Sequence, residues 1–288
     1  MDFQIAGGSV PGTEHTKPGQ PGWTNNQDAF HWRRTDNCLV AVVCDGCGSG
    51  AHSEVGAQVS ARLVVQFVAE AGERYVEQAF LQSDKEARID WERVKILVLS
   101  QIAVLASSMG ESFSKTINDY FLFTIVGALV TPWETFLFSL GDGVFVVNGE
   151  MFQLGPFPNN TPPYLAYNLT GSSLTANQPE LLKIQVNQVI PTSELEDLLL
   201  GCDGVLDLIG LSDKKLPQRD NIIGDIGQFW SDDHYFTNSD AIRRRLALIN
   251  KESAEVVGAT KARVVGGLLP DDTTLIVIRR DPQKEEKV

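Results

Sequence analysis

The chain has 288 residues, of which 43% are hydrophobic and 21% are charged, and its formal net charge is −13. This composition predicts a globular protein with enough apolar residues for a large core. The negative charge argues against nucleic-acid binding, which needs clustered Lys and Arg to contact phosphates. No stretch approaches the ~18 apolar residues of a membrane helix, and no apolar segment follows a basic start as in a secretory signal. We therefore expect a cytoplasmic protein without a membrane partner.

The chain shows no internal linker and no repeat. We expect a single domain over residues 1–280 and a flexible, charged tail over residues 281–288. Gly, Pro and polar residues gather over residues 7–22, which predicts a long arm or loop. Cys44 and Cys47 form a C-x-x-C pattern, but Cys202 and the histidines show no zinc spacing, so a zinc or redox site is the less favoured interpretation.

Apolar patterns predict the helices and strands. The run from Cys38 to Cys44 is apolar throughout, which indicates a strand that is covered on both faces. Apolar residues repeat every four positions after Ser53, and a second amphipathic pattern begins at Asp90, so we expect a helix at each place. The other expected elements are strands over residues 121–130, 135–140, 144–148, 151–154, 182–189, 198–202 and 274–279, helices near 204–211, 222–229 and 240–250, and a loop or flap over 157–179.

The order of these elements predicts the fold class. Helix pairs are interleaved with hairpin-joined strands and do not follow strict βαβ alternation, which favours an α+β fold. A four-layer α/β/β/α sandwich of two antiparallel sheets flanked by helix pairs fits this order. Such a fold would place strand ends from two sheets at a shared cleft.

Four short acidic motifs stand at the ends of expected strands. Each one alone is typical of a turn, because Asp bonds its own backbone and Gly tolerates positive φ. Carboxylates at the ends of buried strands are costly unless they are paired, however. If the four met, they would form a set of oxygen ligands suited to a hard cation. The motifs are Asp45-Gly46, Asp142-Gly143, Asp203-Gly204 and Asp271-Asp272.

These motifs, taken in order with two further acidic positions, resemble the metal-dependent protein phosphatases of type 2C. The first further position is Asp28, in Asn26-Gln27-Asp28, and the second is Asp207, four residues after Asp203. The resemblance extends from about residue 7 to residue 280. The segment that follows Asp45 resembles most the bacterial branch of the family.

The resemblance implies a metal-dependent mechanism. Asp45 would bridge two Mg²⁺ or Mn²⁺ ions, with the carbonyl of Gly46 completing one site, and Asp203 and Asp271 would bind the other ion. Two cations that share a carboxylate can lower the pKa of a water between them and so produce a nucleophile. The implied reaction is hydrolysis of phosphoserine and phosphothreonine in proteins.

Further roles are also implied only by the resemblance. Asp28 would join Asp45 as a catalytic residue that acts through a metal-bound water. Asp142, Asp203 and Asp207 match the positions that hold a third, weaker metal in bacterial members. A phosphorylated protein is the implied substrate, and a serine/threonine kinase is a further candidate partner.

Two positions depart from the family pattern. Trp23 stands where many members carry an Arg that grips the substrate phosphate, and Cys47 stands where animal enzymes carry a His proposed as general acid. His15 is our candidate for the phosphate contact, and His52 is a second histidine that could replace one of these functions. Asp272 stands where many members carry Asn.

The departures leave alternatives open. One is a catalytically weak pseudophosphatase that acts as a kinase-docking or ligand-sensing module. Another is a metal hydrolase that acts on a small phosphorylated molecule. The segment over residues 157–179 lies where the family carries a variable flap, so we expect substrate preference to reside there.

Overall fold

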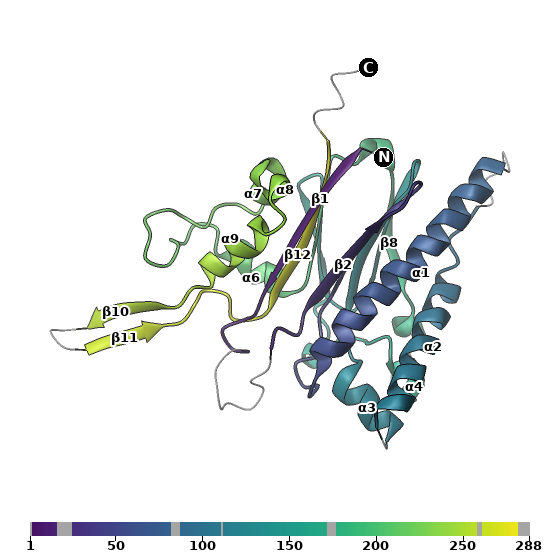
Figure 1. The fold of residues 1–288 in the computed structure, drawn as a ribbon, viewed down its shortest axis with the longest axis horizontal. Coiled ribbons are helices and arrows are strands. Elements are labelled where there is room, and N and C mark those ends of the chain that lie inside the picture. The colour runs from purple at the N-terminus through teal and green to yellow at the C-terminus, as the bar shows by residue number, and fades with distance from the viewer. Residues whose placement is uncertain are drawn as a thin grey trace.

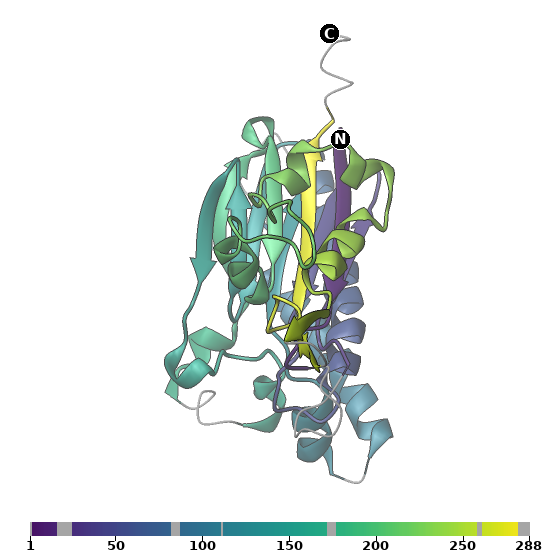
Figure 2. The ribbon, with the colours of Figure 1, turned by 90° about the vertical axis from the view of Figure 1, so that its left-hand side faces the viewer.

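The computed structural model describes residues 2–15, 25–81, 87–110, 112–171, 177–257 and 261–281. Two five-stranded antiparallel sheets are stacked face to face (Figures 1 and 2). The first has the order β1 (Phe3–Val10), β12 (Thr273–Arg280), β9 (Asp197–Gly201), β6 (Gly143–Val147) and β7 (Glu150–Leu154). The second has the order β2 (Ala29–Arg34), β3 (Leu39–Cys44), β4 (Ile125–Val130), β5 (Glu134–Leu140) and β8 (Gln185–Pro191).

Helices cover the outer faces of both sheets (Figure 1). The long helices α1 (Ser53–Leu81) and α2 (Trp91–Met109) cover the second sheet, and α3 (Phe113–Tyr120) follows them. The first sheet is covered by α6 (Gly204–Gly210), α7 (Gln228–Ser231), α8 (His234–Thr237) and α9 (Ala241–Ile249). The predicted α+β sandwich of two antiparallel sheets between helices is confirmed.

Strand β3 shows why the sandwich has two cores. Its odd-numbered residues, from Leu39 to Val43, belong to the core between the two sheets, and its even-numbered residues, from Val40 to Cys44, belong to the core beneath α1 and α2. Successive side chains of a strand point to opposite faces, so a strand between two apolar layers has no position for a polar residue. The continuous apolar run in the sequence therefore identified a central strand.

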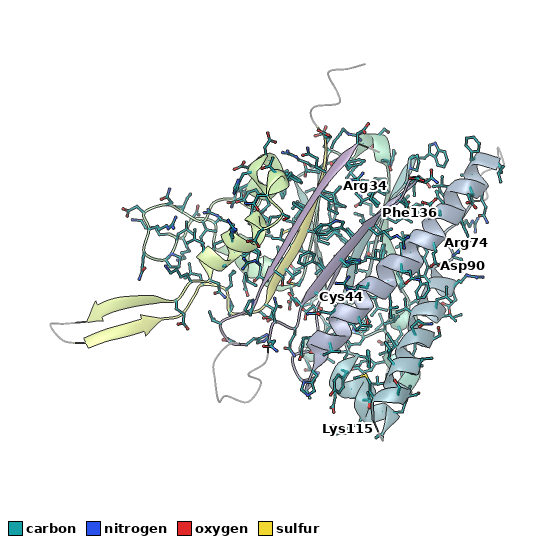
Figure 3. The ribbon with its side chains drawn as sticks, viewed as in Figure 1. Arg34, Cys44, Arg74, Asp90, Lys115 and Phe136 are labelled. Atoms are coloured by element: carbon teal, nitrogen blue, oxygen red, sulfur yellow. The ribbon has the colours of Figure 1, made fainter. Side chains whose placement is uncertain are left out.

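The starts of the two long helices agree with the sequence. Helix α1 begins at Ser53, as expected. Asp90, which is labelled in Figure 3, caps α2, because its Oδ1 accepts a hydrogen bond from the backbone N of Arg93 at 2.9 Å. Close packing explains Gly56 in the first turns of α1, because a Cβ there would overlap the carbonyl oxygen of Tyr120 at the end of α3.

Several expectations for single elements are wrong. Residues 7–10 belong to β1 and not to a loop, and β2, α3 and the hairpin of β10 (Ser253–Val257) and β11 (Lys261–Val265) were not expected. The helix expected near 222–229 is only the short α7 at its end, and the strand expected from residue 182 begins at Gln185. The segment 157–179 holds η1 (Pro158–Asn160) and α4 (Tyr167–Thr170), while 172–176 and the tail from 282 lie outside the described residues.

The remaining short elements are the 3-10 turns η2 (Pro179–Leu182) and η3 (Thr192–Glu194). Among the described residues, no single helix is long and apolar enough to cross a membrane; α2 and α3 reach that length and composition only when they are counted together, across a bend of 113°.

Candidate metal centre

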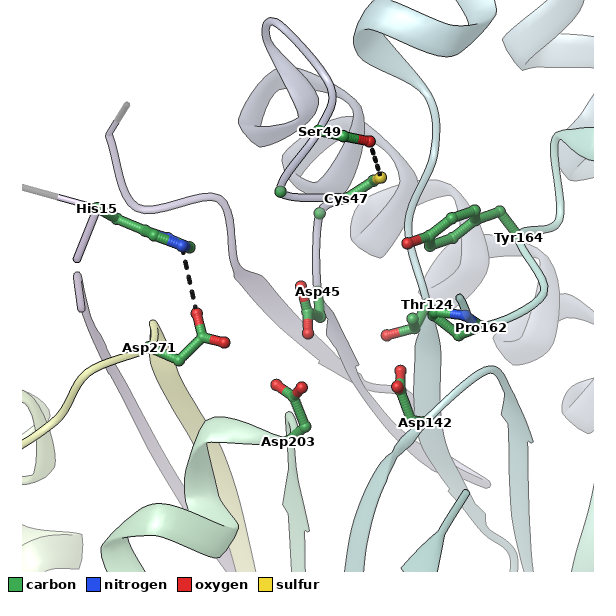
Figure 4. A pocket seen from close by; sticks show the side chains of 12 residues that line it. His15, Asp45, Cys47, Ser49, Thr124, Asp142, Pro162, Tyr164, Asp203 and Asp271 are labelled. Atoms are coloured by element: carbon green, nitrogen blue, oxygen red, sulfur yellow. Dashed lines mark hydrogen bonds and ion pairs between the residues drawn. The ribbon is translucent and has the colours of Figure 1, made fainter. Parts of the chain in front are cut away.

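The four predicted acidic motifs meet at one end of the sandwich and line one pocket (Figure 4). Sheet register accounts for three of them. Gly201, at the end of β9, pairs with Val144 at the start of β6 and with Leu275 at the start of β12. Because antiparallel neighbours run in opposite directions, the end of one strand lies beside the starts of the next two. The aspartates that adjoin these ends are Asp142, Asp203 and Asp271.

Asp45 reaches the same pocket from the other sheet, directly after β3. The backbone N of Thr124 donates to the carbonyl of Asp45 at 2.8 Å, and Gly46 forms an isolated bridge with Phe123. The segment before β4 therefore holds Asp45 at the pocket.

The glycines of two motifs do more than turn the chain. A Cβ at Gly46 would lie 2.6 Å from the carbonyl oxygen of Gln27, and a Cβ at Gly204 would overlap the carbonyl oxygen of Asp272. At both positions a side chain would push one acidic motif away from another. The turn explanation alone does not account for these contacts, because the contacted residues are far away in the sequence.

Mutual repulsion and burial disfavour the charged form of these carboxylates. Burial raises the pKa of Asp45 well above its ordinary value, and Asp28, Asp203, Asp271 and Asp142 raise it further. Burial and Asp203 raise the pKa of Asp142 to about 6, and the same two causes raise that of Asp271 to about 6. A pocket of this kind gains stability from a bound cation, which removes the cost of charging the carboxylates.

Asp28 lies behind the pocket and is only 5% exposed. Burial raises its pKa, Asp272 raises it further, and hydrogen bonds from the thiol of Cys202 and the hydroxyl of Thr274 lower it. One of its carboxylate oxygens, Oδ2, has no hydrogen-bond partner of regular geometry among the described residues. Asp28 also raises the pKa of Asp45, so the two predicted catalytic residues are neighbours, although Asp28 does not line the pocket itself.

Asp272 organises the segments on one side of the pocket, a role that the sequence did not reveal. It is 3% exposed, and its two oxygens accept hydrogen bonds from the backbone N of Gly12 at 2.7 Å and of Gln27 at 2.6 Å. His15 Nδ1 lies 3.0 Å from Asp272 Oδ2, and His15 Nε2 lies 3.5 Å from Asp271 Oδ1. This close contact with Asp272, opposed by burial, raises the pKa of His15 to about 9, although Nδ1 makes no hydrogen bond of regular geometry to the described residues.

The two candidate histidines are placed differently. His15 lines the pocket, where it is the only residue with a side chain able to carry positive charge among the described lining residues (Figure 4). His52 does not line it, and its ring lies against Tyr120 with ring centroids 5.0 Å apart. Trp23 lies outside the described residues.

Further lining residues lie outside the four acidic motifs, and of these Thr124 was not singled out from the sequence because it belongs to no motif. Cys47 lies in the pocket with its Sγ 3.1 Å from Ser49 Oγ, and Pro162, Tyr164 and Thr124 form the opposite wall (Figure 4). Pro162 and Tyr164 come from the segment where substrate preference was expected. Cys47 is a free, half-buried thiol.

Asp207 lies in an adjoining hollow. This hollow shares Asp142, Asp203 and Asp271 with the main pocket and adds Asp207 from the first turn of α6. Burial raises the pKa of Asp207, and Asp203 raises it further. The three aspartates expected at a third metal are thus around one hollow.

The donor set fits Mg²⁺ or Mn²⁺ in its chemistry. Hard oxygen donors converge, and the carboxylates repel one another. Within the part of the chain that the structure describes, no three His, Cys, Asp or Glu side chains form a group that could hold an ion on its own. Mg²⁺ usually keeps several waters and takes only one or two carboxylates, so it does not require such a group.

The raised pKa values have a testable consequence for the metal-free protein. A carboxyl whose pKa is raised on folding contributes stability that is present below its unfolded pKa and is lost as pH rises through its folded pKa. For Asp142 this stability is lost over the pH range between the ordinary pKa of 3.8 and the folded-state pKa of about 6. Asp142→Asn should therefore match wild type at pH 4 and unfold at higher urea concentration above pH 7, with metal removed by a chelator.

The exposed Asp213 lies outside the pocket and supplies the matched control, Asp213→Asn. The measurement is the urea unfolding midpoint of wild type, Asp142→Asn and Asp213→Asn at several pH values between 4 and 8. A difference between Asp142→Asn and wild type that does not change with pH would contradict the electrostatic explanation.

Comparisons with known proteins agree with this geometry. The family model described as Protein phosphatase 2C matches residues 11–233. That range includes Asp28, Asp45, Asp142 and Asp203 but ends before Asp271, which the fold brings to the same pocket. A search of curated proteins finds no match.

Solved structures share the fold at low identity. The crystal structure of one variant of a bacterial serine phosphatase has a TM-score of 0.53 and 16% identity, and the match covers 97% of this chain and 99% of that chain. The crystal structure of a second variant has a TM-score of 0.51 and 15% identity, and the match covers 96% of this chain and 98% of that chain. A C. elegans sex determining protein has a TM-score of 0.52 and 12% identity, with 99% of this chain and 66% of that chain covered.

Proposed function

The chain belongs to the protein phosphatase 2C family, and from this premise we propose that it hydrolyses phosphoserine and phosphothreonine in proteins with the help of divalent cations. The observation that carries the proposal is the convergence of Asp45, Asp142, Asp203 and Asp271, from four separate strand ends, on one pocket. These carboxylates come from both sheets, and the neighbouring carboxylates add to burial in raising the pKa values of Asp45 and Asp142. A purely structural role would not bring four like charges together.

The proposed ion-binding residues are those that the pocket and the adjoining hollow bring together. Asp45, the carbonyl of Gly46, Asp203 and Asp271 would hold two Mg²⁺ or Mn²⁺ ions, and Asp142, Asp203 and Asp207 would hold a third. When bound, the ions would supply a water of lowered pKa and offset the charge that develops on the phosphoryl oxygens.

The chain's own residues would position this chemistry. Asp28 stands behind Asp45, its Oδ2 has no hydrogen-bond partner among the described residues, and we assign it the orientation of a water at the pocket. Asp272 holds the backbone of Gly12 and Gln27, so it would keep His15 and Asp28 in place. We assign the phosphate contact to His15, because it is the one described lining residue that can be cationic.

A pseudophosphatase that docks a kinase or senses a ligand is the second candidate. It is favoured by Trp23, which replaces the Arg expected to grip phosphate, and by Cys47, which replaces a proposed general acid. In either case the proposed partners are phosphorylated proteins or their kinases in the cytoplasm, and the chain's charge of −13 favours neither nucleic acid nor an anionic membrane surface.

The discriminating experiment is Mn²⁺-dependent phosphate release from a phosphothreonine peptide beside a generic aryl phosphate. The proposal expects turnover of the peptide that disappears with chelator. Turnover of the aryl phosphate alone would favour a hydrolase for small molecules. No turnover of several phosphopeptides at saturating Mn²⁺ would favour the pseudophosphatase.

The same assay tests His15. His15→Ala should raise KM for the phosphopeptide several-fold with a smaller change in kcat, because a ground-state contact is lost. His52→Ala is the matched control, since His52 lies outside the pocket. Equal KM values for both variants and wild type would remove His15 from the phosphate site.

A further inference from the structure

Tyr164 brings a hydroxyl group to a pocket that is otherwise rich in carboxylates. Its side chain is 6% exposed and belongs to the core beneath α1 and α2, yet Tyr164 lines the pocket together with Asp45 and Cys47. Figure 4 shows its hydroxyl end directed towards Asp45, with the ring farther from the aspartates. Because the ring is buried, the hydroxyl is the part of Tyr164 that a bound substrate would reach.

The contacts around Tyr164 hold this hydroxyl in one place. Its ring packs edge-on against Tyr167, with ring centroids 5.4 Å apart. Its carbonyl accepts a hydrogen bond from the backbone N of Tyr167 at 3.1 Å, where α4 begins, and the intervening Leu165 and Ala166 are fully buried. A donor that is already in place needs no reorganisation during the reaction, and such donors stabilise a transition state most.

The phenol of Tyr164 keeps its proton at neutral pH. An ordinary tyrosine has a pKa of about 10. Burial raises the pKa of Tyr164 further, and the neighbouring Cys47 and Asp45 add to this effect. The hydroxyl can therefore donate a hydrogen bond, whereas the ionised carboxylates of the pocket only accept.

The geometry of phosphoryl transfer indicates which substrate atom takes this hydrogen bond. In an in-line displacement, the attacking water and the leaving oxygen lie on opposite sides of the phosphorus. Asp142 and Asp203, which are proposed to hold ions, lie on one side of Asp45, and Tyr164 lies on the other (Figure 4). The leaving oxygen would then face Tyr164, and it gains negative charge as its bond to phosphorus breaks.

We propose that the hydroxyl of Tyr164 donates a hydrogen bond to the leaving oxygen of the phosphoserine or phosphothreonine substrate. The bond from phosphorus to this oxygen breaks and its electron pair stays on the oxygen, while a new bond forms between phosphorus and the oxygen of the attacking water. The proton that the water loses ends on the leaving oxygen, and Tyr164 keeps its own. The proposal rests on the proposed function and adds a residue that belongs to none of the acidic motifs.

The test compares Tyr164→Phe with wild type on substrates whose leaving oxygens differ in basicity. A phosphothreonine peptide releases the most basic oxygen, phenyl phosphate a less basic one, and p-nitrophenyl phosphate the least basic. Removing one preorganised donor to a developing oxyanion lowers kcat by about 10²- to 10³-fold, so kcat for the peptide should fall by about that factor. The loss should be smaller for phenyl phosphate and smallest for p-nitrophenyl phosphate.

Tyr75→Phe is the matched control. Tyr75 is 7% exposed in the same core, but its hydroxyl donates to Glu134 at the start of β5, whereas Asp142 follows the end of that strand. This control should lower stability and leave kcat as it is for all three substrates.

Three results would overturn the proposal. The first is a wild-type kcat for the peptide in Tyr164→Phe. The second is a loss of kcat that has the same size for all three substrates, which would indicate a structural role. The third is a rise in KM alone, which would indicate a contact with the phosphoryl oxygens that do not leave.

Failure of the proposed function would be visible separately. If wild type hydrolyses only the two aryl phosphates, hydrolysis of phosphoproteins fails as the function, and the difference between the losses for these two substrates still decides whether Tyr164 contacts the leaving oxygen. If wild type hydrolyses the peptide and Tyr164→Phe does so equally well, only the role of Tyr164 fails. If wild type hydrolyses none of the three substrates, both fail.

Discussion

Asp45→Asn is expected to lower kcat by several orders of magnitude while the protein stays folded. Asp45 is the pocket carboxylate proposed to face both ions, and replacing it with an amide would weaken the binding of both ions at once. The structure adds a second expectation. Because burial and four neighbouring aspartates raise the pKa of Asp45, loss of its charge should leave the metal-free protein at least as stable as wild type at pH 7.

Asp207→Asn is the matched control for this change. Asp207 is exposed and lines only the adjoining hollow, so its loss should affect kcat much less. Steady-state kinetics with saturating Mn²⁺, together with urea unfolding of the chelator-treated proteins, make the comparison. Equal losses of kcat in the two variants would contradict the assigned roles, and an unfolded Asp45→Asn would contradict the electrostatic argument.

Gly204→Ala is expected to destabilise the protein and weaken Mn²⁺ binding together. An alanine Cβ would overlap the carbonyl oxygen of Asp272, which is backbone and cannot rotate away. Overpacking of this kind costs about 1–3 kcal/mol. To relieve the overlap, the backbone at residue 204 would have to move away from Asp272. This movement would also displace Asp203 relative to Asp271, because each of these aspartates adjoins one of the two overlapping residues.

Gly210→Ala, at the other end of the same helix, is the control. Nothing lies within 4 Å of a Cβ added there, and alanine is favoured over glycine in a helix by about 1 kcal/mol. Urea midpoints should therefore move in opposite directions in the two variants. A Gly204→Ala variant with wild-type stability and wild-type Mn²⁺ affinity would show that neither property depends on the close approach of α6 to Asp272.

The parts of the fold that could be predicted have signals that are local in the sequence. The apolar run that ends at Cys44 marks a strand that is covered on both faces. Asp90 marks the start of α2, which it caps. Each aspartate of the site adjoins such a strand, so its place at a strand end was also readable. The order of the motifs then indicated the family, which the family model confirms.

What could not be predicted depends on contacts between segments that are distant in the sequence. Strand β1 contains Gly7 and Gly8, which disfavour a strand locally. In the fold, a Cβ at Gly8 would lie 2.5 Å from the backbone N of Arg243, so glycine is needed where β1 meets α9. Likewise, Asp272 gains its importance only from Gly12 and Gln27, which the fold brings to it from distant parts of the sequence.

The central claim is that the acidic pocket is a binding site for divalent cations that the phosphatase reaction uses. Calorimetric titration of Mn²⁺ into chelator-treated wild type tests it most directly, with Asp203→Asn as the comparison, because Asp203 lines both the pocket and the adjoining hollow. Wild type should bind Mn²⁺ at more than one site, and Asp203→Asn should lose that multi-site binding. Absence of binding in wild type, or the same binding in both proteins, would contradict it.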